Sequence, residues 1–317
     1  MNTFQQKPKV EMIINILNTS ISSKESESLN FIREISAVFI VICHLLQHSG
    51  GYSAAWIFNV AVQIFFFMSG YLYGSKESIS TIQFYKKRIV KVYLPYFIYI
   101  TTVILVLIAF SNTLTIKQII GAYLCRIPLP FSGHLWFITA LFLYYFTLPF
   151  IANTLKKKHL STFILFVFFG GLICIYNWTY CAWYILFYLG FFSKKYDFTK
   201  KLCYPALIIS ILIPLILGKD LNIKSDNFPN IIFHFALGTF LFSFMLRYIN
   251  GNITKYIIWK GYSYEIFLVH VLFLLGPLSV LHLTPYGFIN IIIFWVLTYT
   301  AAVLLNRFSI FFAILSI

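Results

Sequence analysis

Residues 31–46, FIREISAVFIVICHLL, form an apolar segment that is interrupted only by Arg33, Glu34 and His44. The charge-free run that begins inside it, residues 35–75, contains no Lys, Arg, Asp or Glu. This run is long enough for two membrane-spanning helices of roughly 20 residues each. Ionisable side chains are costly inside such a segment, so Arg33 and His44 indicate a functional site.

The same apolar character continues along the chain, which has 317 residues, of which 60% are hydrophobic and 10% are charged. A soluble domain carries about 25% charged residues. The other charge-free runs are 92–116, 127–155, 159–193, 202–218, 227–246 and 266–306. They predict one, one, two, one, one and two spans, which makes ten with the first pair. We therefore expect an all-α membrane protein, a polytopic bundle of about ten transmembrane helices.

The distribution of Lys and Arg tests that topology, because these residues collect in short cytoplasmic loops. With the N-terminus inside, ten spans place 20 of them inside and 4 outside. Both termini are therefore predicted to be cytoplasmic, with a polar tail at 1–28 and a membrane domain at 29–317. The net charge of +15 follows from this topology. We expect a bilayer as partner and no nucleic acid, although inner basic loops could attract an anionic ligand or anionic lipid heads.

Arg33 and His44 share one face of the first predicted helix. Eleven residues at 100° each end about 20° past three full turns, with a rise of ~16 Å. Arg33 is then placed at the inner interface, and His44 slightly past the middle of the membrane core. Two simpler interpretations stay open: Arg33 could extend its side chain to the interface, and His44 could be bonded to a neighbouring helix.

A proton acceptor at that depth has to be histidine, because none of the nine carboxylates is predicted near the midplane. His44 and His270 reach it, and the usual histidine pKa near 6.5 suits acid–base catalysis. His134 and His282 fall near outer span ends. The remaining histidines are expected at the surface: His48, His159 and His234. The five cysteines show no C-x-x-C spacing, so neither a disulfide framework nor a metal site is expected.

Three further stretches stand out, and each has a structural alternative. FFFMSGYL, 65–72, ends the second predicted span with Ser69 and Gly70, small residues that suit a ligand or simple helix packing. FYKKRIVKVYLPYF, 84–97, is a basic and aromatic start to the third span, suited to anion binding or to anchoring the topology. GYSYEIFLVH, 261–270, carries Glu265 and His270 on one predicted helix.

Together these stretches resemble the membrane-bound acyltransferase 3 family, the bacterial inner-membrane O-acyltransferases. The family pattern of arginine, ten residues and histidine falls on Arg33 and His44. Its FF-x-x-SG-Y/F-L motif matches 66–72, its H-L-W-F motif resembles GHLWFI at 133–138, and its SY-x-I-Y-L-x-H motif resembles YSYEIFLVH at 262–270. Its basic R-x-x-R/K…P-Y segment matches four residues in order: Arg88, Lys91, Pro95 and Tyr96. The order holds over about 30–305.

This chain departs from the family pattern at three points. Glu34 follows the arginine where a small residue is common, and Lys91 stands in place of an arginine. A lysine does not replace the bidentate geometry of an arginine. The acidic residue often found late in the last span is absent around LLNRFSIFF, 304–312.

The resemblance implies an enzyme, an O-acetyltransferase or related acyltransferase, that modifies a polysaccharide at the bacterial plasma membrane. It implies acyl-CoA, most simply acetyl-CoA, as co-substrate, no tightly bound cofactor and no metal, and a saccharide or lipid-linked glycan as acceptor. Arg33 and His44 would be catalytic, and Arg33 would also bind acyl-CoA. The other expected acyl-CoA contacts are Arg88, Lys91 and Ser69. Supporting or acceptor-binding roles fall to His134, Trp136, Glu265 and His270.

Two other classes of membrane protein also fit a bundle with buried ionisable residues. A transporter or flippase of a lipid-linked saccharide would line its path with Arg33 and His44. That alternative is weakened because no inverted repeat is visible and no midplane carboxylate is predicted for ion coupling. A saccharide polymerase would need a large outer loop, and the longest one predicted here is short.

Overall fold

The structure is a computed structural model that describes residues 23–76, 78–126, 129–156, 158–217, 227–249, 256–257 and 259–315. Residues 1–22, most of the predicted polar tail, lie outside the described residues. The first described helix, α2, begins at Ser23 rather than after residue 28.

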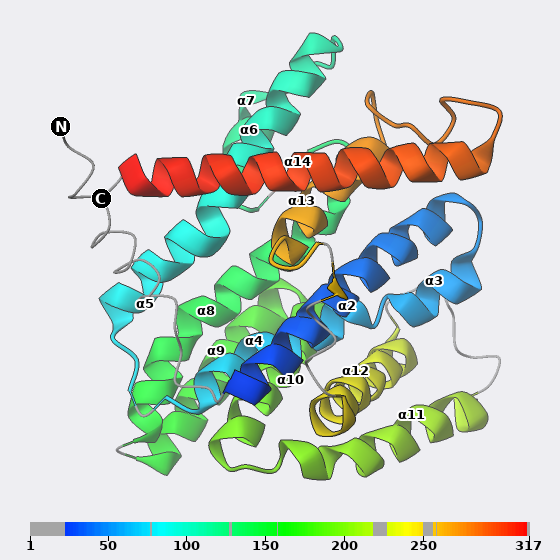
Figure 1. The fold of residues 1–317 in the computed structure, drawn as a ribbon. Coiled ribbons are helices and arrows are strands. Elements are labelled where there is room, and N and C mark those ends of the chain that lie inside the picture. Colours follow the sequence, from blue (N-terminus) through cyan, green and yellow to red (C-terminus); the bar gives the residue numbers. More distant parts are fainter. Residues whose placement is uncertain are drawn as a thin grey trace.

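The described chain is built from helices (Figure 1). The N-terminal half contains α2 (Ser23–His48), α3 (Tyr52–Phe58), α4 (Ala61–Gly74), α5 (Thr81–Arg88), the π-helical turn η1 (Ile89–Tyr93), α6 (Leu94–Ala109), α7 (Ile116–Tyr123), the 3₁₀ turn η2 (Gly133–Leu135) and α8 (Trp136–Leu155). The C-terminal half contains α9 (His159–Tyr176), α10 (Trp178–Lys195), the 3₁₀ turn η3 (Thr199–Leu202), α11 (Cys203–Leu217), α12 (Phe228–Tyr248), α13 (Ser263–Leu274) and α14 (Gly287–Leu315).

Eight helical segments of the described chain are long and apolar enough to cross a membrane. This confirms the expected all-α, multi-pass class. Helices α10 and α13 stand where the two remaining spans are predicted. The 12 residues of α13 extend only ~18 Å at 1.5 Å per residue, less than the ~30 Å hydrocarbon core. The number of crossings and the cytoplasmic termini therefore stay predictions.

Helix α4 packs against α2, α10 and α12 near the centre of the bundle. Its closest neighbour is α10, because glycines remove side chains where the two backbones meet. A Cβ atom on Gly70 would overlap the carbonyl oxygen of Phe187, and one on Gly190 would overlap that of Phe67. Gly70 of the predicted SG motif therefore serves helix packing, the structural alternative given above.

The basic segment 84–97 is helical throughout, with a π-helical turn between α5 and α6. Pro95 has no N–H to donate to the carbonyl group four residues earlier. A π turn is a common way to accommodate such a break, and such turns are frequent at functional sites. The turn lies directly after Arg88 and contains Lys91, two of the predicted acyl-CoA contacts.

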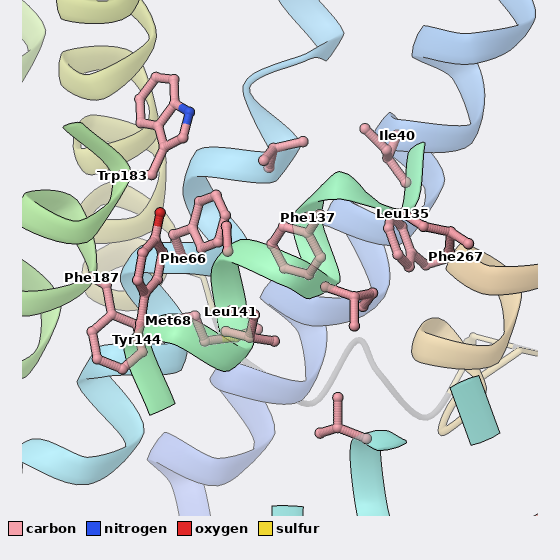
Figure 2. Close-up of a cluster of buried hydrophobic side chains, with 14 of the residues drawn as sticks. Ile40, Phe66, Met68, Leu135, Phe137, Leu141, Tyr144, Trp183, Phe187 and Phe267 are labelled. Atoms are coloured by element: carbon pink, nitrogen blue, oxygen red, sulfur yellow. The ribbon is translucent and has the colours of Figure 1, made fainter. Parts of the chain in front are cut away.

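Three segments far apart in the sequence meet on one side of α2. Helix α13 contacts α2, α6 and α14, and α14 runs across α6 and α13 in Figure 1. Figure 2 shows Ile40 of α2, Leu135 of η2, Phe137 at the start of α8 and Phe267 of α13 gathered in one part of the buried core. These are the elements that carry His44, His134 and His270.

Candidate active site

Three histidines form what we call the imidazole cluster: His44 of α2, His134 of η2 and His270 of α13. Their ring centroids lie 6.3 Å apart for His44 and His134, 5.2 Å for His44 and His270, and 5.3 Å for His134 and His270. His134 and His270 are buried and His44 is partly buried. The sequence placed His134 at an outer acceptor site and offered His270 as an alternative base, whereas the structure brings all three together.

In each of the two buried imidazoles, those of His134 and His270, one nitrogen has a hydrogen-bond partner among the described residues and the other has none. Nε2 of His134 lies 3.1 Å from the carbonyl oxygen of Leu268. Nδ1 of His270 lies 3.1 Å and 2.8 Å from the carbonyl oxygens of Ile266 and Phe267. A carbonyl oxygen only accepts, so these nitrogens carry the hydrogen. Nδ1 of His134 and Nε2 of His270 are therefore lone-pair acceptors, and both are buried without a hydrogen-bond partner among the described residues.

His44 is oriented by its own helix. Its Nδ1 lies 3.0 Å from Oε1 of Gln47, one turn further along α2. The amide oxygen accepts, so Nδ1 donates and Nε2 keeps its lone pair. A neutral imidazole held in this tautomer can take a proton at Nε2, as a general base requires.

Aromatic and aliphatic side chains surround the imidazole cluster. The rings of Phe267 and Tyr99 lie 5.5 Å and 6.3 Å from His134, and Phe137 packs on Phe267 at 5.3 Å (Figure 2). Such a shell excludes water and strengthens electrostatic interactions within the cluster.

A second group of side chains forms what we call the basic cluster: Arg33, Lys76, Lys87, Arg88 and Lys91. The other four members all lie within electrostatic range of Lys91. Of these five side chains, Arg33 alone forms an ion pair with a carboxylate among the described residues, that of Glu34. The other four positive charges have no carboxylate partner in the described part of the chain, and such a group favours binding of an anion such as phosphate.

Arg88 is held in this cluster by aromatic rings. Its guanidinium lies 5.4 Å from the ring centre of Tyr73, 5.7 Å from that of Phe84 and 5.2 Å from that of Tyr145. Its Nε is buried and has no hydrogen-bond partner in the described part of the chain. Cation–π contacts hold an arginine without using all of its donors. The sequence pointed to Arg88 but not to these three rings.

Arg33 of the basic cluster and His44 of the imidazole cluster lie on the same helix, because α2 is continuous from Ser23 to His48. Its Nη2 donates to Asn30 at 2.7 Å, and its Nε lies 3.8 Å from Oε1 of Glu34. Glu34 is fully buried and accepts the backbone N–H of Gly261 at 3.0 Å. The departure from the family pattern at Glu34 thus has a structural role, because the carboxylate ties α2 to the segment before α13.

Glu265, predicted as a supporting residue, accepts a hydrogen bond of 2.9 Å from Nδ2 of Asn306. It lies within electrostatic range of Arg33 and Glu34, and not in the imidazole cluster. Asn306 stands in the LLNRFSIFF segment, where the family's acidic residue is absent. An amide that donates to Glu265 links α13 to α14 there.

Two other predicted site residues are not brought to the imidazole cluster. Ser69 is buried in α4 and makes no hydrogen bond with a described residue. The indole of Trp136 packs against Phe66 and Tyr180, at 6.1 Å and 5.7 Å. The structure records no ring contact between Trp136 and the three imidazoles within the described part of the chain.

The surface prediction holds for His48 and His159, which are exposed, and is wrong for His234. His234 is buried, because α12 packs it beneath α3. All five cysteines are free, and they range from buried Cys43 to exposed Cys174. Among the described residues, no group of three or more His, Cys, Asp or Glu side chains is placed to hold a metal ion.

Comparison with protein families gave one match, and it covers most of the chain. The sequence profile described as an acyltransferase domain, that of the acyltransferase 3 family, matches residues 26–307. Comparisons with curated proteins and with solved structures found no match. The matched region includes both clusters and all the motifs quoted above. The chain therefore belongs to the acyltransferase 3 family, and it is a multi-pass membrane acyltransferase.

Proposed function

We propose that this acyltransferase moves an acyl group, most simply acetyl, from acyl-CoA to a hydroxyl group of a cell-envelope or secreted saccharide. The observation that carries the proposal is the lone pair on Nε2 of His44, inferred from the contact of its Nδ1 with Gln47, on the helix that also carries Arg33 of the basic cluster. The expected setting is the plasma membrane of a bacterium.

The donor is expected to bind first at the basic cluster. Acyl-CoA is cytosolic and carries several phosphate charges, which Arg33, Arg88 and Lys91 can pair with. Arg33 and His44 are eleven residues apart on one helix face, a rise of ~16 Å. The pantetheine arm separates the phosphates of CoA from its thioester. It can therefore extend along α2 and bring the acyl group to His44.

His44 then acts as general base. Its Nε2 takes the proton of the acceptor hydroxyl while the hydroxyl oxygen attacks the thioester carbonyl carbon. The tetrahedral intermediate collapses by breaking the carbon–sulfur bond, and the CoA thiolate takes the proton back from His44. The products are an O-acyl saccharide and CoA. General-base catalysis of this kind contributes about 10²–10⁴ in rate. In the alternative with an acyl-His44 intermediate, Nε2 first displaces the CoA thiolate from the thioester carbonyl carbon, and the acceptor hydroxyl then displaces the imidazole and gives up its proton.

The test uses membranes that contain wild type or His44→Ala at matched expression. They receive radiolabelled acetyl-CoA and a crude pool of envelope glycans, and label released from glycan by mild base is counted. Labelling by wild type alone supports the proposal. Equal labelling by both removes His44 from the chemistry. If wild type labels nothing with acetyl-CoA or succinyl-CoA, the saccharide acyltransferase assignment is wrong.

A further inference from the structure

Nδ1 of His134 and Nε2 of His270 are acceptor atoms for which the described residues provide no hydrogen-bond donor. Both atoms are buried, and no described side chain or backbone group donates to them. A buried acceptor that stays unpaired costs free energy, so native structures rarely leave one without a partner. The second nitrogen of each ring is already used to fix the ring to α13. The two rings thus lie beside His44, and each keeps one lone pair that no described group uses.

We propose that His134 and His270 bind the acceptor itself, each accepting a hydrogen bond from a hydroxyl group next to the one that is acylated. The inference rests on the proposed function and narrows its substrate class to an acceptor with neighbouring hydroxyl groups, as on a sugar ring. Three imidazoles with centroids 5.2–6.3 Å apart present three acceptor nitrogens to such a run of hydroxyls.

The chemistry of the imidazole cluster discriminates against other acceptors. A simple alcohol would satisfy one nitrogen and leave the others unpaired, which is a strong basis for rejection in a buried polar site. An ionised carboxylate or phosphate only accepts hydrogen bonds, so it cannot pair with the lone pairs of these imidazole nitrogens. A protonated amine could donate hydrogen bonds but has no lone pair with which to attack the thioester.

A small hollow lies near the imidazole cluster. It is lined in part by Tyr99, Phe131, Ser132 and Pro277, and the ring of Tyr99 lies 6.3 Å from that of His134. Phe131 is exposed there, and its aromatic face suits the C–H face of a sugar ring. Trp136 and Glu265, given acceptor-binding or supporting roles from the sequence, contribute nothing to this arrangement.

The two histidines can be tested with opposite pairs of amide variants, because an asparagine oxygen falls near Nδ1 of histidine and a glutamine oxygen near Nε2. His134→Asn and His270→Gln keep an acceptor where the lone pair was and lose the bond that fixes the ring. His134→Gln and His270→Asn keep a donor toward the α13 carbonyls and lose the substrate contact.

The measurement is the apparent KM for the crude glycan pool and, separately, for acetyl-CoA, with thermal unfolding of each purified variant in detergent. His134→Gln and His270→Asn are expected to raise the glycan KM by about five- to tenfold each, the effect of one lost hydrogen bond. Their KM for acetyl-CoA is expected to stay within about twofold of wild type. His134→Asn and His270→Gln are expected to retain most of the glycan affinity.

The opposite ranking overturns the inference. If the two histidines only support the fold, the variants that keep the α13 bonds will be the better enzymes and the more stable proteins. A rise confined to the acetyl-CoA KM also overturns it. Absence of labelling by wild type is a different result, since it removes the proposed function and this inference with it.

Discussion

Buried histidines occur in two regions of this bundle, and they differ in how their nitrogens are paired. His234 of α12 has Nδ1 2.9 Å from the carbonyl oxygen of Asn230 and Nε2 2.7 Å from that of Trp56. His270 of α13 is at least as buried, since 0% of its surface is exposed against 4% for His234. Its Nε2 nevertheless has no hydrogen-bond partner among the described residues. Burial is therefore a poor indicator of function here. The informative signal is the nitrogen without a neighbour: each ring nitrogen of His234 lies within hydrogen-bond distance of a carbonyl oxygen, to one of which a neutral ring donates at a time, whereas Nε2 of His270 has no partner among the described residues.

The largest expected effect of any substitution is that of His44→Ala. Removing the general base is expected to lower the transfer rate by about 10²–10⁴, with little change in the unfolding temperature, because His44 is only partly buried. The rate is measured with radiolabelled acetyl-CoA, and unfolding by thermal denaturation in detergent. If His44→Ala lost stability as well as rate, His44 would be a residue that supports the fold, like His234.

Arg88→Lys tests whether the guanidinium group of Arg88 in the basic cluster binds acyl-CoA. Lysine keeps the charge but loses the planar fork that the rings of Tyr73, Phe84 and Tyr145 hold. The KM for acyl-CoA is expected to rise about tenfold or more, as for loss of a hydrogen bond to a charged group. Arg126→Lys, at an exposed position outside the basic cluster, is the matched control. Equal KM values for the two variants would show that Arg88 does not bind the donor.

For His234→Leu we expect the opposite of the His44→Ala result, namely a loss of stability without a loss of activity. The change removes both ring nitrogens and leaves the carbonyl oxygen of Trp56 without this donor, which costs about 1–3 kcal/mol of unfolding free energy. Transfer activity per folded molecule is expected to match wild type. A lower unfolding temperature with unchanged KM and rate would confirm this role. A selective loss of activity would mean that paired nitrogens do not mark a structural histidine.

The smallest expected effect concerns pH at the basic cluster. Burial, together with the charges of Lys87 and Arg88, lowers the pKa of Lys76. A lowered pKa means that the ammonium group loses its proton at a pH below the usual lysine value of about 10.4. The acyl-CoA KM is then expected to rise about two- to threefold in the alkaline range, as one weakly coupled charge disappears.

Lys76→Arg provides the control for this pH effect, because arginine stays protonated throughout the accessible range. The acyl-CoA KM of the variant is expected to lose the alkaline rise. A rise that persists in Lys76→Arg would assign the titration to another group.

Local sequence properties were enough to predict the all-α, multi-pass class and to place Arg33 and His44 on one helix. Apolar run length predicts the spans because a helix in a bilayer pairs its own backbone groups and needs no distant partner. The shared face of Arg33 and His44 follows from the helical repeat alone. The ordered motifs also identified the family, since each is a short pattern that can be detected without knowing what it touches.

Contacts between distant segments were decided only by the tertiary structure. The imidazole cluster joins positions 44, 134 and 270, and the free lone pairs follow from carbonyl groups of Ile266, Phe267 and Leu268. The aromatic surroundings of Arg88, the tie from Glu34 to Gly261 and the burial of His234 are likewise interactions between separate helices. The physical reason is that helix periodicity determines which face a side chain occupies, whereas packing determines which nitrogen on that face finds a partner.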